Sequence, residues 1–198
     1  MTFDVLYIDC PWKFTNAKTG GSHKSGSGQK YPVMTLQELC GLPVGSIAGP
    51  GSVAFIWVPT AMKFSHAPTV AHAWGFHHYI TTIYWEKQRL GMGFWFRNMV
   101  EELLVFSREA GAVSPFRCQR PNTLHLPASE HSEKPEEFRK LIEEATGKIS
   151  SRQCVELFAR RQVPGWTRIG NQVTGRDIRT DLRLLAATDP EWRKASLV

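Results

Sequence analysis

Short apolar strands alternate with helices along this chain. Residues 3–8 predict a first buried strand, and residues 52–59 predict the clearest one. Thr35 and Glu38 predict a capping box that starts a short helix at 35–39. Further strands are predicted at 77–85, 102–107, 153–159 and 166–170, and further helices at 69–73, 133–145 (with Ser132 as its N-cap) and 177–186. This alternation predicts an α/β fold built on a layered, mostly parallel sheet.

The 198 residues fit one domain, which we expect to span residues 1–187 and to be followed by a C-terminal tail at 188–198. Two segments interrupt the pattern of strands and helices. Residues 15–30, rich in Gly, Ser and Lys, predict a solvated loop and are a candidate lid over the end of the first strand. Residues 110–132, rich in Pro, Arg, Asn and His, predict a long irregular insert near a binding face.

Composition excludes several classes of protein. The content of 42% hydrophobic and 21% charged residues is typical of a globular chain, and the net charge of +6 mildly favours a polyanionic partner. The four cysteines form no CxxC pair and the histidines show no zinc spacing, so we expect free thiols and no metal. No apolar run approaches the ~20 residues of a membrane helix. The first strand leaves no room for a signal peptide, so we expect a cytoplasmic protein without a membrane segment.

The tetrad Asp9-Cys10-Pro11-Trp12 directly follows the first strand. The Asp9 carboxylate and the Cys10 carbonyl can accept the two hydrogens of a base amine, which favours a pyramidal, nucleophilic nitrogen as positive charge develops on it. Pro11 stiffens the turn, and Trp12 offers a stacking face worth ~1–3 kcal/mol to an extruded base. Taken alone, the four residues fit a purely structural turn equally well.

Other motifs follow the tetrad in a fixed order. They lie at residues 31–34, 55–58, 74–76, 85–87, 91–101, 132–135, 156–160 and 165–172. With them the chain resembles, from about Asp4 to Gly175, the MT-A70 family of S-adenosylmethionine-dependent adenine N-6 methyltransferases, in particular its small bacterial and phage DNA adenine methyltransferases. The resemblance implies a three-layer α/β/α Rossmann-like methyltransferase with permuted motif order, in which the catalytic tetrad precedes the cofactor segment. That order would explain why no Gly-rich fingerprint follows the first strand.

The resemblance also implies roles for individual residues. The catalytic residues would be Asp9, Cys10, Pro11 and Trp12. S-adenosylmethionine would be held by Asp9, Lys134, Glu156, Phe158, Arg160, Asn171 and Gln172, and the target nucleotide would meet Trp12, Tyr31, Lys87, Arg97 and Glu101. Structural alternatives stay open for three of them: Glu156 as a paired core acid, Lys134 as a solvated helix start, and Lys87 as a member of a surface salt bridge.

Cys10 departs from the family, which usually has Pro at this position. The chemistry needs a backbone carbonyl, which Cys10 supplies, but the rigidity of a fixed φ is lost. A thiol nucleophile at Cys10 is the rival interpretation, although no paired histidine base or phosphate-cradling loop follows it.

The implied partner is nucleic acid, with DNA favoured over RNA because the chain is one small domain. Within the insert at 110–132, a candidate for target recognition, Arg117, Arg120 and Asn122 could read flanking bases, or the insert is a solvent loop. A catalytically silent nucleic-acid-binding homologue is the alternative from another class. Such members have lost the acid and the aromatic residue of the tetrad, and Asp9 and Trp12 are both present here.

Overall fold

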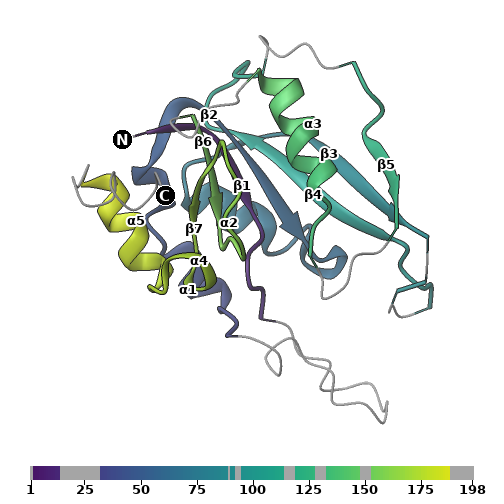
Figure 1. Ribbon diagram of the computed structural model, residues 1–198. Helices are drawn as coiled ribbons and strands as arrows, with labels where there is room; N and C mark the ends of the chain where they lie inside the picture. Colours follow the sequence, from purple (N-terminus) through teal and green to yellow (C-terminus); the bar gives the residue numbers. More distant parts are fainter. Residues whose placement is uncertain are drawn as a thin grey trace.

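In the computed structural model, a mixed sheet runs through the molecule (Figure 1). The structure describes residues 2–13, 32–88, 90–91, 95–113, 119–127, 133–147 and 153–187. Within these residues the sheet has seven strands in the order β5-β3-β4-β2-β1-β6-β7. Their bounds are β1 (Phe3–Ile8), β2 (Ala48–Val58), β3 (His78–Lys87), β4 (Val100–Ser107), β5 (Thr123–Leu126), β6 (Cys154–Leu157) and β7 (Thr167–Ile169).

The strands run mostly parallel, as predicted. β1 pairs in parallel with β2 and β6, β6 with β7, and β3 with β5. β4 is antiparallel to both of its neighbours, β2 and β3. The carboxyl ends of the other described strands therefore meet at one edge of the sheet, together with the first residues of β4. We call this the carboxyl edge.

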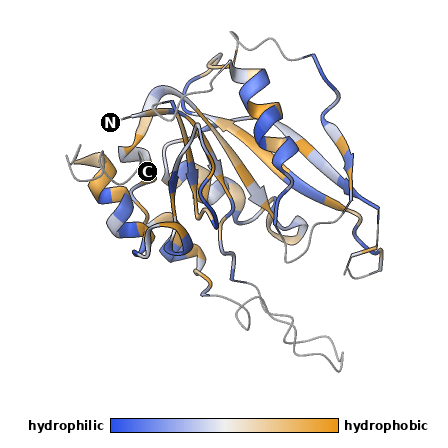
Figure 2. Cartoon of the chain, viewed as in Figure 1, coloured by the Kyte–Doolittle hydropathy of each residue, from blue (hydrophilic) through white to orange (hydrophobic). Residues whose placement is uncertain are grey.

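Helices cover both faces of the sheet. They are α1 (Leu36–Cys40), α2 (Ala67–Ala73), α3 (Glu136–Thr146), α4 (Asn171–Thr174) and α5 (Ile178–Ala186), with 3₁₀ turns at Val44–Ser46 and Thr60–Met62. Figure 2 shows mostly hydrophobic central strands, whereas α3 and α5 carry both hydrophobic and hydrophilic residues. Helices with one apolar face are those that pack against a sheet and expose their polar side to water.

Alternate residues of β1 point into two separate cores, since successive side chains of a strand face opposite sides of the sheet. Tyr7 packs in one core with Phe138 of α3. Leu6 and Ile8 pack in the other, with side chains from α1, α2 and α5. The three layers predicted for the chain are therefore present, with α3 on one side of the sheet and α1, α2 and α5 on the other.

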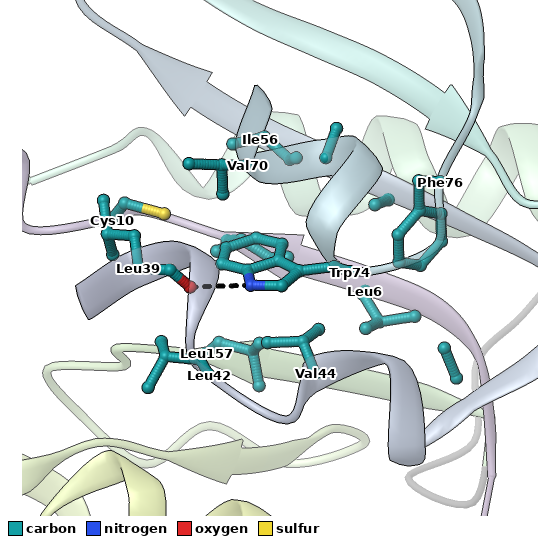
Figure 3. Close-up of a cluster of buried hydrophobic side chains, with 14 of the residues drawn as sticks. Leu6, Cys10, Leu39, Leu42, Val44, Ile56, Val70, Trp74, Phe76 and Leu157 are labelled. Atoms are coloured by element: carbon teal, nitrogen blue, oxygen red, sulfur yellow. Dashed lines mark hydrogen bonds between the residues drawn. The ribbon is translucent and has the colours of Figure 1, made fainter. Parts of the chain in front are cut away.

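Trp74 lies near the centre of the second core, where its indole N–H donates to the Leu39 carbonyl at 2.8 Å (Figure 3). Burying a Trp with its polar N–H satisfied combines a large apolar contact with no unpaired donor. This core anchors α1 and α2 against β1, whose last residue precedes the tetrad.

Local patterns in the sequence are confirmed at several elements. β1 has the predicted bounds. At α1 the Thr35 hydroxyl accepts from the Glu38 N–H at 3.2 Å, and the Glu38 carboxylate accepts from the Thr35 N–H at 2.8 Å, so the capping box is present. α5 begins one residue later than predicted, after Asp177, whose side chain caps it. β2 begins four residues earlier than expected because Ala48 pairs with Phe3.

Two expectations are corrected. The insert at 110–132 contains a sheet strand, β5, whose parallel pairing with β3 is reinforced by a 3.0 Å hydrogen bond from the Trp85 indole to the Leu126 carbonyl. In addition, α3 begins at Glu136, with the extended Pro135 as its N-cap, instead of starting after Ser132. A residue before proline is biased towards extended backbone, which delays the helix start. Ser132, the candidate lid at 15–30 and the tail at 188–198 lie outside the described residues.

Candidate active site

A chain of ion pairs surrounds Asp9 at the carboxyl edge. Its Oδ2 lies 3.3 Å from Lys134 Nζ and 3.9 Å from an Arg160 guanidinium nitrogen. Lys134 Nζ also lies 3.3 Å from Glu101 Oε2, and the other Glu101 oxygen pairs with Lys87. We call this sequence, Arg160–Asp9–Lys134–Glu101–Lys87, the ion-pair chain. All five were predicted site residues.

The sheet topology explains why these five residues meet. Asp9 follows β1, Arg160 comes shortly after β6, and β1 and β6 are parallel neighbours. Because β4 is antiparallel to β3, Glu101 near its start lies beside the last residues of β3, which ends at Lys87. Lys134 precedes α3, on the same side of the sheet as Tyr7. Segments distant in sequence thus supply alternating charges at one edge.

Lys134 is the centre of this arrangement. Its side chain is only 13% exposed, and its ammonium lies 5.3 Å from the centre of the Trp57 ring, within cation–π range. Burial alone would lower the pKa of Lys134, but the adjacent Asp9 and Glu101 carboxylates outweigh burial and raise the pKa. Burial would likewise raise the pKa of Glu101, but Lys134 and Lys87 outweigh it and lower the pKa. Each charge therefore stabilises its neighbour.

Backbone hydrogen bonds fix the tetrad turn. The Trp12 N–H donates to the Cys10 carbonyl at 2.9 Å, and the Met34 N–H donates to the Pro11 carbonyl at 2.8 Å. The Lys13 N–H donates back to Met34 at 3.1 Å, which closes a short parallel bridge. A carbonyl oxygen has two lone pairs, so its bond to Trp12 leaves the Cys10 carbonyl able to accept a second donor. These bonds hold the turn without a proline at position 10.

The Cys10 thiol points into the core beside Leu39 and Val70 (Figure 3). The residue is 5% exposed, and burial, assisted by the negative charge of Asp9, raises the pKa of the thiol well above its ordinary value. Buried thiols in apolar surroundings are inert, because the thiolate is the reactive form. The arrangement argues against a thiol nucleophile.

Trp12 is a core side chain in this structure. It is 5% exposed, and its indole N–H donates to the Trp57 carbonyl at 2.8 Å. This burial does not match the open stacking face expected from the sequence, because the Trp12 ring packs in the core and is hydrogen-bonded to β2. Stacking of a base on Trp12 stays a prediction and would require the ring to be uncovered.

A pocket adjoins Asp9 on the α3 side of the sheet. Five of the seven residues predicted to hold the cofactor line it: Asp9, Lys134, Glu156, Phe158 and Arg160. The other two, Asn171 and Gln172, begin α4 after β7, are exposed, and do not line this pocket. Their cofactor role stays a prediction.

Glu156 forms an ion pair with Arg168, its register partner on β7. Burial raises the pKa of Glu156 and lowers that of Arg168 to about 10. The pairing agrees with the structural alternative left open for Glu156, and a direct cofactor contact stays a prediction. Arg168 and Arg139 also line the pocket, and each has a buried Nε without a hydrogen-bond partner among the described residues. Neither arginine was predicted from the sequence. Arg168 is placed by the register of β6 against β7, which opposes it to Glu156, and Arg139 by the face of α3 that packs on the sheet.

The backbone after β6 bends sharply beside this pocket. Phe158 has φ +61°, a left-handed conformation that is costly for a residue with a side chain. Gly170 packs against the bend so closely that a Cβ there would lie 2.6 Å from the Ala159 carbonyl oxygen and 2.8 Å from the Ala159 nitrogen. The bend carries Arg160 towards Asp9, and the glycine leaves room for it.

Three other residues were predicted to contact the target nucleotide: Lys87, Arg97 and Tyr31. Lys87 is in an ion pair, as its structural alternative proposed, and its nucleotide contact stays a prediction. Arg97 is exposed and donates to the Gly91 carbonyl at 2.6 Å, in the connection between β3 and β4. Tyr31 lies outside the described residues.

The described residues contain no group of side chains able to hold a metal ion. Likewise, none of the helices described here has the length and apolarity to cross a membrane.

Comparison with known proteins identifies the family. The MT-A70 family profile matches residues 3–172. The chain belongs to the MT-A70 family. The Type II methyltransferase M.MunI of Mycoplasma sp is 26% identical over 187 residues, which cover 86% of this chain and 78% of that protein.

Two further relatives are N(6)-adenine-specific methyltransferases named METTL4. The Mus musculus protein is 26% identical over 195 residues and the Homo sapiens protein 25% identical over 190 residues. Each alignment covers 87% of this chain but 38% of the relative, so the chain spans well under half of those proteins. Family membership confirms the resemblance seen in the sequence, the Rossmann-like methyltransferase fold and the class of adenine N-6 methyltransferases.

Proposed function

We propose that this MT-A70 chain transfers a methyl group from S-adenosylmethionine to the exocyclic N-6 amine of adenine in DNA. The observation that carries the proposal is the position of Asp9. Its carboxylate lies at the carboxyl edge, 25% exposed, beside a pocket lined by four other residues predicted to hold the cofactor. Ligands of open α/β sheets bind at this edge.

The tetrad can activate a poorly nucleophilic amine. The adenine amine lends its lone pair to the ring, so the pair must return to nitrogen before the nitrogen can accept a methyl group. Asp9 and the Cys10 carbonyl can each accept one amine hydrogen, which favours the pyramidal form. Positive charge then grows on nitrogen, and a fixed carboxylate stabilises that charge most strongly in the transition state.

The pocket suits S-adenosylmethionine chemically. The cofactor carries a carboxylate, an amine, a ribose and an adenine, and supplies an electrophilic methyl group when bound. Lys134 would hold its carboxylate, Arg160 would reach its ribose, Glu156 would accept from its hydroxyl or amine groups, and Phe158 would contact its apolar surface. Arg139 and Arg168 add positive charge to the pocket wall, which suits an anionic group of the cofactor.

DNA is the proposed substrate class, with RNA as the second candidate. The net charge of +6 favours either polyanion. The chain aligns with 78% of the Type II methyltransferase but with 38% of each METTL4 protein, which supports the small bacterial and phage type as the better comparison.

The test measures transfer of labelled methyl from S-adenosylmethionine to matched DNA and RNA oligonucleotides. Each pool presents adenine in every short sequence context, so that transfer is detected whatever flanking bases the enzyme prefers. Nucleoside mass spectrometry then identifies the methylated atom. We expect N-6-methyladenine in DNA above the level in RNA.

The outcomes separate the alternatives. Preferential transfer to RNA would show that RNA is the substrate instead of DNA, and it would leave the proposed methylation of the adenine amine unchanged. Cofactor and nucleic-acid binding without transfer to either pool would instead favour a catalytically silent binding homologue.

A further inference from the structure

Exposed apolar side chains gather at the carboxyl edge. Among the described residues, five large hydrophobic side chains are strongly exposed, and four of them lie in connections at this edge: Phe64, Leu90, Trp95 and Phe96. Trp95 is 99% exposed and Phe96 82% exposed. The fifth, Tyr79, lies near the opposite end of β3. Large aromatic side chains left in water beside an active site indicate a surface that is covered by a partner.

The connection that carries Trp95 and Phe96 has a braced stem. The Lys87 N–H donates to the Met99 carbonyl at 2.7 Å, and the Gly91 N–H donates to the Asn98 carbonyl at 2.8 Å. A Cβ on Gly91 would lie 2.5 Å from that Asn98 oxygen, so the two sides of the stem touch. Trp95 and Phe96 are therefore presented on a support that starts at Lys87, a member of the ion-pair chain.

Two cationic side chains flank this aromatic pair, one of them, Lys87, in an ion pair with Glu101. Lys87 lies at the base of the stem, and Arg97 directly follows Phe96 while bonding to the Gly91 carbonyl. The end of β3 and the start of β4 lie at the same edge of the sheet as the end of β1, because β1 is parallel to β2 and β4 is antiparallel to β2 and β3. Aromatic faces interleaved with cations are the combination that binds nucleic-acid bases and phosphates together. An apolar protein partner would not require these charges.

Duplex DNA sets a specific problem for this enzyme class. The target adenine must leave the base stack to reach Asp9, and unstacking costs a few kcal/mol. Proteins that open base steps insert apolar wedges between them. We propose that Trp95 and Phe96 form such a wedge, stacking on the bases beside the target adenine and occupying the space that it leaves. The proposal rests on the proposed function, since it assigns a paired DNA substrate to the same site.

The first test compares paired and unpaired substrate. Methyl transfer is measured on the duplex pool and on the same strands unpaired, for the wild type, the double variant Trp95→Ala/Phe96→Ala, and Tyr79→Ala as an exposed aromatic control at the far end of β3. We expect the double variant to lose about tenfold or more in kcat/KM on duplex and less than about threefold on single strands. An abasic site opposite the target should restore its duplex rate. Equal loss on both substrates, or no loss, would overturn the wedge.

The second test does not depend on transfer. Trp192, which lies outside the described residues, is replaced by Phe. Among the described tryptophans Trp95 alone is strongly exposed, so quenching of its fluorescence reports on stacking. We expect the duplex pool to quench the emission, and Trp95→Phe to remove the quenching. Quenching without methyl transfer would reject the proposed function and keep the wedge as a nucleic-acid contact.

Two results would overturn the wedge even if the enzyme is active. One is unchanged Trp95 emission on saturation with duplex. The other is a shift from dimer to monomer in Trp95→Ala/Phe96→Ala by sedimentation, with DNA binding unchanged, which would assign the aromatic pair to contacts between copies of the chain.

Discussion

Lys134 joins the carboxylate of Asp9, the proposed catalytic residue, to a second acid. Its Nζ lies 3.3 Å from Asp9 Oδ2 and 3.3 Å from Glu101 Oε2, so one ammonium holds two carboxylates in place at the carboxyl edge. The Trp57 ring lies under the ammonium and limits its movement. The geometry of Asp9 therefore depends on a residue more than a hundred positions away in sequence.

Replacing this cation should damage both stability and cofactor binding. In Lys134→Met the length of the side chain is kept, but Asp9 and Glu101 lose the positive charge between them. We expect the free energy of unfolding to fall by about 1–3 kcal/mol, and S-adenosylmethionine affinity to fall at least about tenfold. Urea unfolding and titration calorimetry measure the two effects. Lys140→Met, on the exposed side of α3, is the matched control, and equal behaviour of the two variants would contradict the role of Lys134.

The ion pair between Glu101 and Lys134 should make the free energy of unfolding depend on pH in the acid range. The pKa of Glu101 is lowered in the folded protein from an ordinary value of 4.5. Its contribution is therefore present above about pH 4.5 and is lost as pH falls through the lower, folded-state pKa. Urea unfolding between neutral pH and about pH 3 should show a smaller loss of stability in Glu101→Gln than in the wild type. Parallel curves for the two proteins would refute this linkage.

The thiol of Cys10 should be dispensable for chemistry. Cys10→Ala keeps the backbone carbonyl and the turn, so methyl transfer should stay within about twofold of the wild type, at a stability cost of about 1 kcal/mol for the small cavity. The folded wild type should also resist thiol-reactive reagents at this position. Loss of transfer in a folded Cys10→Ala protein would restore the nucleophile hypothesis.

The close approach of Gly170 to Ala159 should make this glycine essential. In Gly170→Ala the new methyl group would overlap the backbone at the bend after β6 and displace Arg160 from Asp9. We expect a stability loss of about 1–3 kcal/mol together with weaker cofactor binding. Gly51→Ala is the control, because a Cβ on Gly51 meets nothing within 4 Å. Thermal unfolding and calorimetry compare the pair, and matching results would show that the bend tolerates the side chain.

Features with a local cause were predictable from the sequence. The apolar run of β1 ends at Asp9, and the capping box needs only Thr35 and Glu38, four positions in one turn. The family motifs also predicted the five residues of the ion-pair chain as site residues, but they did not predict the contacts between them. Those contacts depend on the register and direction of β4, which no single segment encodes.

Other features were missed because their cause is not local. β5 is four residues long and gains its stability from pairing with β3, so its segment has the composition of an irregular insert. Arg168 is buried because it opposes Glu156 across two strands. The burial of Trp12 likewise follows from its bond to Trp57, forty-five positions away.

The central claim is that the Asp9 carboxylate activates the amine of adenine. Single-turnover methyl transfer to the adenine-containing DNA pool, at saturating S-adenosylmethionine, measures the chemical step in the wild type, in Asp9→Ala and in Asp4→Ala, a control from the other end of β1. The account predicts that Asp9→Ala loses about 10²–10³-fold in rate, while Asp4→Ala stays close to the wild type. Transfer by a folded, cofactor-bound Asp9→Ala protein at the wild-type rate would contradict it.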